Sequence, residues 1–475
     1  MARMEGSGNV AEKVAERVGR DALPPGPPLS AMPVVLAAMR TDPLRFLVSL
    51  TRRYGDVIRL RFVLWNVYLV WRPEHVKHVL QDRHAIYTKG KPDYQVLKRI
   101  LGEGLVTSDG DHWLRQRRLM QPAFHRTSIA AFAALIVERT RVLLESWEEP
   151  ARRGTSVDIY HQMRRLSLDV VTRALFGVKL HEDARAVGEA FAVLSEELAD
   201  HLYSPFFFFF LLPALPTPGN RRARRALRTL DEIVGSIIAR RRADVSDADD
   251  DLLALLLRAR DDDGGGEGMT DRQIRDEVMT LLLAGHETTA MALSWTWFLL
   301  DRHPAIAARV RREVLEALGD RDATVEDLPR LAYVTRVLEE AMRLYPPAWM
   351  FTRTAREPDE IGGYAVPPKT IVMVSPYVTH RAPAVWDEPE RFDPDRFTPE
   401  RSAGRPRFAY FPFAGGPRQC IGSEFALTEA TLVVATIAQR WRLELATGRP
   451  VVPRPSITLR PRRGLPMIPR PHAAA

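Results

Sequence analysis

The chain contains a single cysteine, Cys420, among its 475 residues. One thiol cannot form an intrachain disulfide, a four-cysteine zinc site or an iron–sulfur cluster held by several thiolates. The uses that remain are packing as a small apolar side chain, attack as a nucleophile, and ligation of a metal at one axial position. A single cysteine also agrees with a reducing compartment.

Long hydrophobic runs are absent as well. No apolar stretch approaches the roughly 20 residues that span a bilayer, and residues 1–22 form a polar tail without the apolar centre of a signal peptide. We therefore expect a cytoplasmic protein with no transmembrane anchor. One short segment, Pro205–Pro216, is unusually apolar because it contains Phe206–Phe210. Three interpretations stay open for this segment: a lid or entrance, a buried helix, or peripheral contact with a membrane surface.

The excess of positive charge is small, with 68 Lys and Arg against 60 Asp and Glu. The densest basic run, Arg221–Arg225, is followed by apolar residues at helical spacing, which predicts a solvated helix face. The sequence has no zinc-ligand set and no glycine fingerprint for binding the phosphates of a flavin or nicotinamide. We expect no nucleic-acid partner and no self-contained flavin or nicotinamide chemistry.

The patterns that are present predict a mainly α protein with a smaller β region. Segment Leu23–Pro28 is rich in proline and reads as a stiff extended spacer, so we place the start of a single domain, 23–475, after the tail. Alternating and β-branched residues at 57–62 and 65–70 predict a small sheet. Helical periodicity covers about 110–200 and 222–345, with a glycine-rich connector at Asp261–Gly266.

The surroundings of Cys420 argue against simple packing as the use of the thiol. Phe413–Gly422 has the pattern F-x-x-G-x-R-x-C-x-G. Gly416 and Gly422 let the backbone approach a flat, bulky partner, and Arg418 can pair with a carboxylate. A helix that begins just after the cysteine would point its first amides at the sulfur and favour the thiolate.

A second group of chemical residues lies within one long predicted helix. Thr270 and Gln273 form a capping box, and the apolar pattern continues to Asp301, just before a proline. The middle of this helix reads Ala284–Thr289 (A-G-H-E-T-T). Glycine weakens the helix there, and the Thr288 hydroxyl can bond the carbonyl four residues back, so a local groove can open.

This groove combines an alcohol with an adjacent carboxylate, Glu287. Such a pair suits dioxygen activation, which requires protons while bulk water stays out. The neighbouring His286 is interpreted as a polar packing residue rather than a metal ligand.

Phe413–Gly422 resembles the haem-binding loop of the cytochromes P-450, the haem-thiolate monooxygenases. Three further segments are similar to motifs of that family. They are the Ala284–Thr289 segment, the E-x-x-R pair of Glu340 and Arg343 with the F-x-P-x-R-F segment Phe392–Phe397, and the W-x-x-x-R pair of Trp113 and Arg117. The resemblance implies a buried structural triad in which Arg396 joins Glu340 and Arg343.

The resemblance also implies the cytochrome P-450 fold, with haem b lying between the long helix and the cysteine loop. It implies that Cys420 is the metal ligand, that Thr288 is the hydroxyl beside dioxygen, and that Glu287 is the acid of a proton relay. The residues expected to contact the cofactor are Trp113, Arg117, Ala284, Arg353, Phe413, Arg418, Cys420 and Gly422.

The implied function is hydroxylation of a C–H bond in a lipophilic small molecule such as a fatty acid, terpenoid or carotenoid. Electrons would come from a separate ferredoxin or flavodoxin with an NAD(P)H-dependent reductase, and Arg115 and Arg118 could contribute to its docking patch. Two alternatives stay open: a peroxide-dependent peroxygenase or isomerase, and a non-catalytic haem sensor. The pair of Glu287 and Thr288 argues against the peroxide alternative, because an oxidant that is already reduced needs no proton relay.

Overall fold

The structure is a computed structural model that describes residues 23–62, 65–90, 93–124, 126–177, 183–202, 217–243, 251–259 and 268–472. Three predictions, on the tail 1–22, the segment 205–216 and the connector 261–266, lie outside the described residues. No described helix has the length and apolar character that crossing a membrane requires.

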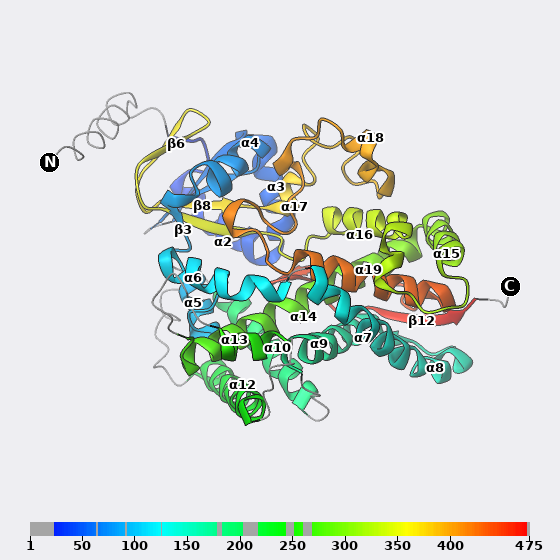
Figure 1. Cartoon of the computed structure of the whole chain (residues 1–475). Helices are drawn as coiled ribbons and strands as arrows, with labels where there is room; N and C mark the ends of the chain where they lie inside the picture. Colours follow the sequence, from blue (N-terminus) through cyan, green and yellow to red (C-terminus); the bar gives the residue numbers. More distant parts are fainter. Residues whose placement is uncertain are drawn as a thin grey trace.

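Helices dominate the described part of the chain (Figure 1). They are α2 (Met32–Thr41), α3 (Pro43–Tyr54), α4 (Pro73–Lys77), α5 (Asp93–Leu101), α6 (Gly110–Met120), α7 (Arg126–Glu145), α8 (Glu148–Arg153), α9 (Ile159–Phe176), α10 (Asp183–Leu202), α12 (Pro218–Ala243), α13 (Leu252–Arg258), α14 (Asp271–Arg302), α15 (Pro304–Leu318), α16 (Ala332–Leu344), α17 (Pro376–Thr379), α18 (Pro399–Ser402) and α19 (Ser423–Arg440).

Helix α14 lies at the centre and confirms the predicted long helix. Its capping box is formed, because Gln273 N donates to Thr270 Oγ1 at 3.3 Å and Thr270 N donates to Gln273 Oε1 at 2.8 Å. It ends just before Pro304, which begins α15. Helices α9, α16 and α19 pack against it (Figure 1), so most of its side chains are buried whatever their direction.

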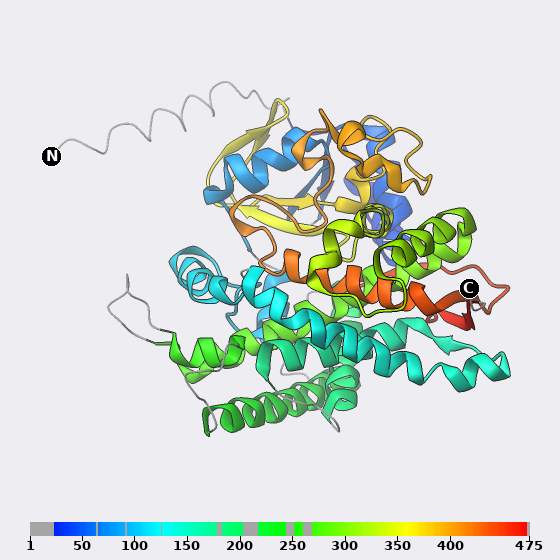
Figure 2. The ribbon, with the colours of Figure 1, turned by 45° about the vertical axis from the view of Figure 1, so that its right-hand side comes forward.

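The largest sheet gathers strands from both ends of the chain. Its order is β1 (Val57–Arg61), β2 (Asn66–Val70), β8 (Ile371–Val374), β5 (Phe351–Ala355) and β3 (Tyr87–Thr88). Strands β1 and β2 were predicted as parts of a small sheet, and they pair antiparallel. Strand β8 joins β2 in parallel from about 300 residues downstream. Figure 2 shows this sheet on one side of the stacked helices.

Smaller β elements complete the fold. One sheet has three strands, β4 (Val157–Asp158), β12 (Pro466–Pro471) and β9 (Trp441–Leu445). Two antiparallel hairpins pair β6 (Asp359–Ile361) with β7 (Tyr364–Val366), and β10 (Pro453–Pro455) with β11 (Leu459–Pro461).

The proline-rich segment Leu23–Pro28 is extended, as predicted, but it is docked rather than a free spacer. Arg59 N of β1 donates to Pro25 O at 2.9 Å. A Cβ on Gly26 would lie 1.9 Å from Arg59 O, so only glycine allows this approach. The segment docks because β1 is an edge strand, and the Arg59 amide has no partner within the sheet. The sequence pattern alone does not reveal which strand lies at the edge.

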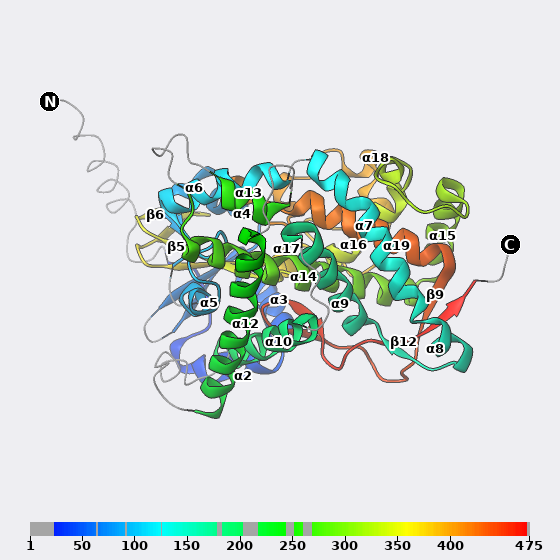
Figure 3. The same ribbon diagram turned by 60° about the horizontal axis from the view of Figure 1, so that its bottom comes forward.

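The basic run Arg221–Arg225 is confirmed as part of a solvated helix face. Its four arginines are exposed on α12, while Ala226, Leu230 and Ile233 of the same helix are buried. Helix α12 packs against α10 through this apolar face, and Figure 3 shows the two helices crossing.

Candidate functional site

The loop before Cys420 is shaped by close backbone approaches. Cys420 N donates to Phe413 O at 3.0 Å, which closes the loop. Gly416 has φ +69°, and a Cβ there would lie 2.0 Å from Leu80 O. Glycine is therefore required at this position for two independent reasons, its backbone conformation and the lack of space. Helix α19 starts at Ser423, directly after the loop.

The Cys420 thiol is open to a cavity on one side and enclosed by protein on the others. Burial raises its pKa, because the thiolate is disfavoured away from water. A hydrogen bond from the Gly422 backbone amide and the charge of Arg117 act in the opposite direction. The expected amide near the sulfur is present, and a cation bound at the sulfur would favour the thiolate further.

The cavity has a volume of about 340 Å³ and lies between the cysteine loop and α14. Its walls are mostly apolar. Nine of the ten predicted site residues line it together, and they are Trp113, Arg117, Ala284, Thr288, Arg353, Phe413, Arg418, Cys420 and Gly422. Glu287 is the exception.

Thr288 and Glu287 are adjacent in sequence but have different surroundings. Thr288 Oγ1 donates to Ala284 O at 2.7 Å, the back-bond that the sequence predicts. Glu287 is buried, and its Oε1 accepts a hydrogen bond from Thr458 Oγ1 at 2.9 Å. A Cβ on Gly285 would lie 2.9 Å from Val171 Cγ2, so this glycine lets α9 approach α14 beside the site.

His286 packs as predicted and does not line the cavity. It is buried, its Nδ1 is hydrogen-bonded to Leu282 O, and its ring lies 5.5 Å from that of Phe191. Burial lowers its pKa to about 4, which leaves the imidazole neutral at physiological pH.

Cationic side chains gather at one end of the cavity. Arg353 Nη1 donates to Tyr94 OH at 3.2 Å. Arg418 forms an ion pair with Asp109 and lies 4.2 Å from the Trp113 ring centroid. Arg117 Nη1 donates to Gln419 O at 2.7 Å, next to the cysteine.

Sequence reasoning missed two residues of this cationic end, Lys89 and Tyr94, which also line the cavity. Lys89 Nζ donates to Leu105 O at 3.1 Å. Burial, together with the charges of Arg418 and Arg353, holds the pKa of Lys89 well below its usual range. No motif contains Lys89, and only the packing of β3 and the following segment against β5 brings it here.

These surroundings fit haem. The cavity combines an exposed thiol, apolar walls and three clustered basic side chains, Lys89, Arg353 and Arg418, with Asp109 as the ion-pair partner of Arg418. Haem is a flat apolar group with two carboxylates at one edge, and these carboxylates need cationic or hydrogen-bonding partners when they are buried. The excess of positive charge at one end of an apolar cavity matches that need.

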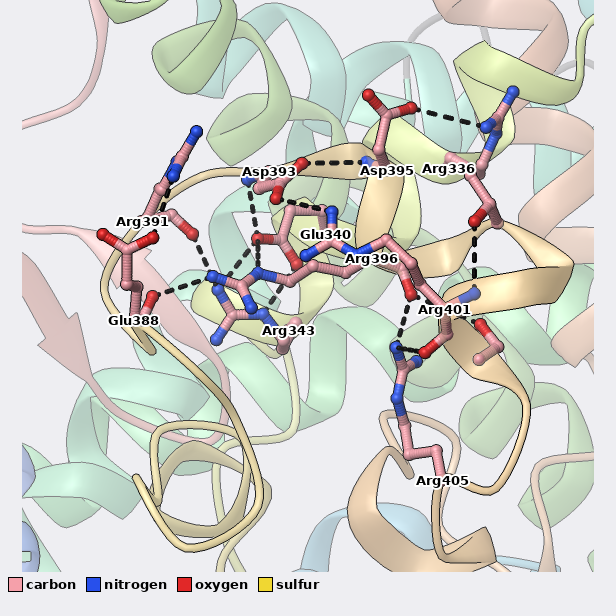
Figure 4. Close-up of polar contacts among 12 residues, drawn as sticks. Arg336, Glu340, Arg343, Glu388, Arg391, Asp393, Asp395, Arg396, Arg401 and Arg405 are labelled. Carbon is pink, nitrogen blue, oxygen red and sulfur yellow. Dashed lines mark hydrogen bonds and ion pairs between the residues drawn. The ribbon is translucent and has the colours of Figure 1, made fainter.

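The predicted triad of Glu340, Arg343 and Arg396 forms a buried polar network that does not line the cavity (Figure 4). Arg343 Nε and Nη2 donate to the two oxygens of Glu340 at 2.6 and 2.8 Å. Arg396 Nε lies 3.4 Å from Glu340 Oε1, and Asp393 N donates to the same oxygen at 2.9 Å. The triad is confirmed, and it ties α16 to the segment that leads into the cysteine loop.

Comparisons with known proteins agree with this geometry. A family model described as cytochrome P-450 matches residues 24–468. The chain is 43% identical over 465 residues to cyclooctatin synthase of Streptomyces melanosporofaciens, which covers 97% of this chain and 98% of that protein. It is 39% identical over 414 residues to cyclooctat-9-en-7-ol 5-monooxygenase of the same organism, covering 86% of this chain and 87% of that protein.

A solved structure shows the same fold. The crystal structure of the cytochrome P-450DA heme domain has a TM-score of 0.85 and 29% sequence identity, covering 95% of this chain and 98% of that one. The predicted fold class, mainly α with a smaller β region, is confirmed. This chain belongs to the cytochrome P-450 family and is a monooxygenase that uses haem b.

Proposed function

We propose that this cytochrome P-450 hydroxylates a C–H bond of a cyclic terpenoid. The cavity walls beside Thr288 are apolar, with Val171, Leu281 and Phe351 among them, so a lipophilic substrate can be enclosed without stranding polar groups. One relative is named for cyclooctat-9-en-7-ol, a cyclic alcohol, and another for cyclooctatin. These names favour a cyclic terpenoid over the fatty acids and carotenoids that the sequence also allows.

The proposed roles around the cofactor follow from the cavity lining. Cys420 is the ligand to the haem iron, and bound haem supplies dioxygen activation. The side chains proposed to hold the haem carboxylates are Trp113, Arg117, Arg353, Arg418 and, in addition, Lys89. Ala284, Phe413 and Gly422 are proposed to contact the rest of the cofactor. In this arrangement residues 23–475 act as one haem-binding domain.

Thr288 and Glu287 are proposed to deliver protons. The Thr288 hydroxyl lines the cavity, and its bond to Ala284 O holds it beside the groove in α14. Glu287, the adjacent acid on the helix, is buried and is proposed to pass protons to this hydroxyl. The mostly apolar walls exclude bulk water, so protons reach the cavity through these two side chains.

Electrons are proposed to come from a separate ferredoxin or flavodoxin and its NAD(P)H-dependent reductase. The single cysteine leaves no ligands for an iron–sulfur cluster in this chain. Helix α6 contacts the cysteine loop through Arg117. The same helix carries Arg118, which is exposed, and Arg115, whose Nη2 donates to Gly268 O at 3.3 Å. These arginines are proposed as part of the docking surface for an acidic donor.

The observation that carries the proposal is the placement of the Thr288 hydroxyl and the Cys420 thiol in one apolar cavity. Thr288→Ala should uncouple the reaction, so that oxygen is consumed with about tenfold less product per O2. Thr296→Ala is a matched control, because Thr296 makes the same back-bond, to Ala292 O at 2.7 Å, without lining the cavity. Oxygen consumption and product are measured with a ferredoxin donor system and a panel of cyclic terpenoids, fatty acids and carotenoids.

The same assay tests the two alternatives. Fast turnover with hydrogen peroxide and none with O2 and the donor would identify a peroxygenase or isomerase. No product under either condition would count for a haem sensor. Equal coupling in wild type and Thr288→Ala would contradict the proposed proton delivery by Thr288.

A further inference from the structure

The tip of the hairpin β10–β11 is buried against the central helix. Hairpin tips usually lie at the surface, because their backbone groups need water as a partner. Here Ser456 and Thr458, both at the tip, are only 4% and 3% exposed. A loop held in this way needs protein partners for its polar groups.

Four hydrogen bonds supply these partners from separate parts of the fold. Trp295 Nε1 of α14 donates to Leu459 O at 2.7 Å, and Trp349 Nε1 donates to Ser456 O at 2.9 Å. Ser456 Oγ donates to the carbonyl of Ser195 in α10 at 3.2 Å, and Leu459 N donates to Pro347 O at 3.0 Å. The position of Thr458 between these anchors is therefore set by tertiary contacts on both sides.

The side chain of Thr458 contacts the proposed relay acid. Its Oγ1 donates to Glu287 Oε1 at 2.9 Å. Glu287 is 3% exposed, and its other oxygen, Oε2, has no hydrogen-bond partner among the described residues. Tyr160 interacts electrostatically with Glu287, Arg164 and Arg460. Arg460 Nη2 in turn lies 3.4 Å from Oε1 of Glu196, whose side chain is exposed.

We propose that Thr458 is a positioning residue of the proton relay, which holds Glu287 Oε1 and leaves Oε2 as the oxygen that exchanges protons. This inference rests on the proposed function. A carboxyl oxygen that accepts a hydrogen bond has a lone pair engaged, so the unpartnered oxygen Oε2 is the one open to a proton. In this arrangement Oε2 passes protons toward Thr288 and takes them up from solvent on the Glu196 side.

The test compares two substitutions of Thr458 in the haem-loaded enzyme. Thr458→Val keeps the shape and removes the hydroxyl, whereas Thr458→Ser keeps the hydroxyl. We expect about tenfold less product per O2 in the valine variant, and coupling within about twofold of wild type in the serine variant. Thr296→Val controls for loss of a buried threonine hydroxyl in the same fold.

Peroxide-driven turnover separates positioning from a general structural role. An oxidant that is already reduced bypasses the relay, so Thr458→Val should retain peroxide-driven turnover within about twofold of wild type. An equal loss in both assays, an equal loss in the serine and valine variants, or unchanged coupling in Thr458→Val would overturn the proposal.

An infrared measurement tests the contact without turnover. Glu287→Gln identifies the carboxyl band of Glu287 in difference spectra. This band should shift in Thr458→Val and stay in place in Thr296→Val, because only the first removes a donor to Oε1. An unshifted band would overturn the positioning role. If wild type fails to use O2 while the band shifts as expected, the proposed function fails and the contact stands.

Discussion

At the scale of single residues, Arg343 shows how a buried charge can be satisfied. Its side chain has no exposure, and it donates to both oxygens of Glu340 and to the carbonyls of His380, Pro389 and Arg391. The planar guanidinium holds its N–H donors in a fixed fork, and an ammonium group cannot reproduce that arrangement. The sequence spacing predicted the pair with Glu340, but the three carbonyls depend on chain segments that approach only in the fold.

Arg343→Lys should lower the free energy of unfolding by on the order of 3 kcal/mol, because Glu340 and the carbonyls lose donors in a buried position. Arg391→Lys is the control, since its ion pair with Glu388 is exposed, and it should leave stability unchanged within error. Urea unfolding of both variants checks this. Equal midpoints for the two variants would contradict the structural role of the triad.

At the scale of elements, local chemistry explains which parts of the fold could be predicted. Helix α14 was predicted because the capping box and the following His-Pro pair mark its ends within the sequence. The cysteine loop was recognised from the pattern Phe413–Gly422, yet the partner that demands Gly416, the carbonyl of Leu80, lies in a distant segment. The docked position of Leu23–Pro28 on β1 was missed for the same reason.

Gly416→Ala should distort the cysteine loop and reduce haem content per chain several-fold, because a Cβ meets Leu80 O and φ is +69°. Gly404→Ala provides a matched control. Gly404 also has a positive φ, +77°, but its Cβ would meet nothing within 4 Å, so only the strain of about 1 kcal/mol is expected. Haem absorbance per protein after loading measures the difference. Equal haem content in the two variants would contradict the interpretation that close contact with Leu80 O requires glycine at position 416.

At the scale of the whole molecule, the cavity depends on segments that meet only after folding. Eight of the nine predicted residues that line the cavity could be found because they belong to motifs, whereas Arg353 was named from the family resemblance alone. Lys89 and Tyr94 could not be placed at the cavity from the sequence. Strands β3, β5 and β8 come from separate regions of the chain, and nothing in the local sequence of these strands signals that they pair. The same holds for Thr458, which reaches Glu287 through the hairpin β10–β11.

Folding also buries carboxyl groups that the sequence does not mark. Burial raises the pKa of Glu277 in α14 and of Glu429 in α19 to about 8. Both are charged in the unfolded chain above about pH 4.5. Between about pH 5 and 8 the folded state therefore binds protons that the unfolded state has released, and these two groups make stability fall as the pH rises.

The double variant Glu277→Gln, Glu429→Gln removes this dependence. Its free energy of unfolding relative to wild type should rise with pH from 5 to 8, with a slope of up to about 1.4 kcal/mol per pH unit for each proton. Below pH 4 the slope should vanish, because both carboxyl groups are then protonated in either state. Parallel stability curves for wild type and variant across pH 5–8 would contradict the buried, protonated state of these side chains.

The most direct test of the account is the absorption spectrum of the reduced, haem-loaded protein with carbon monoxide. If Cys420 holds the iron, wild type shows the red-displaced Soret band of thiolate-ligated haem, and Cys420→Ser loses it together with turnover. A wild-type spectrum without that band, or a serine variant with an unchanged spectrum and turnover, would contradict the central claim.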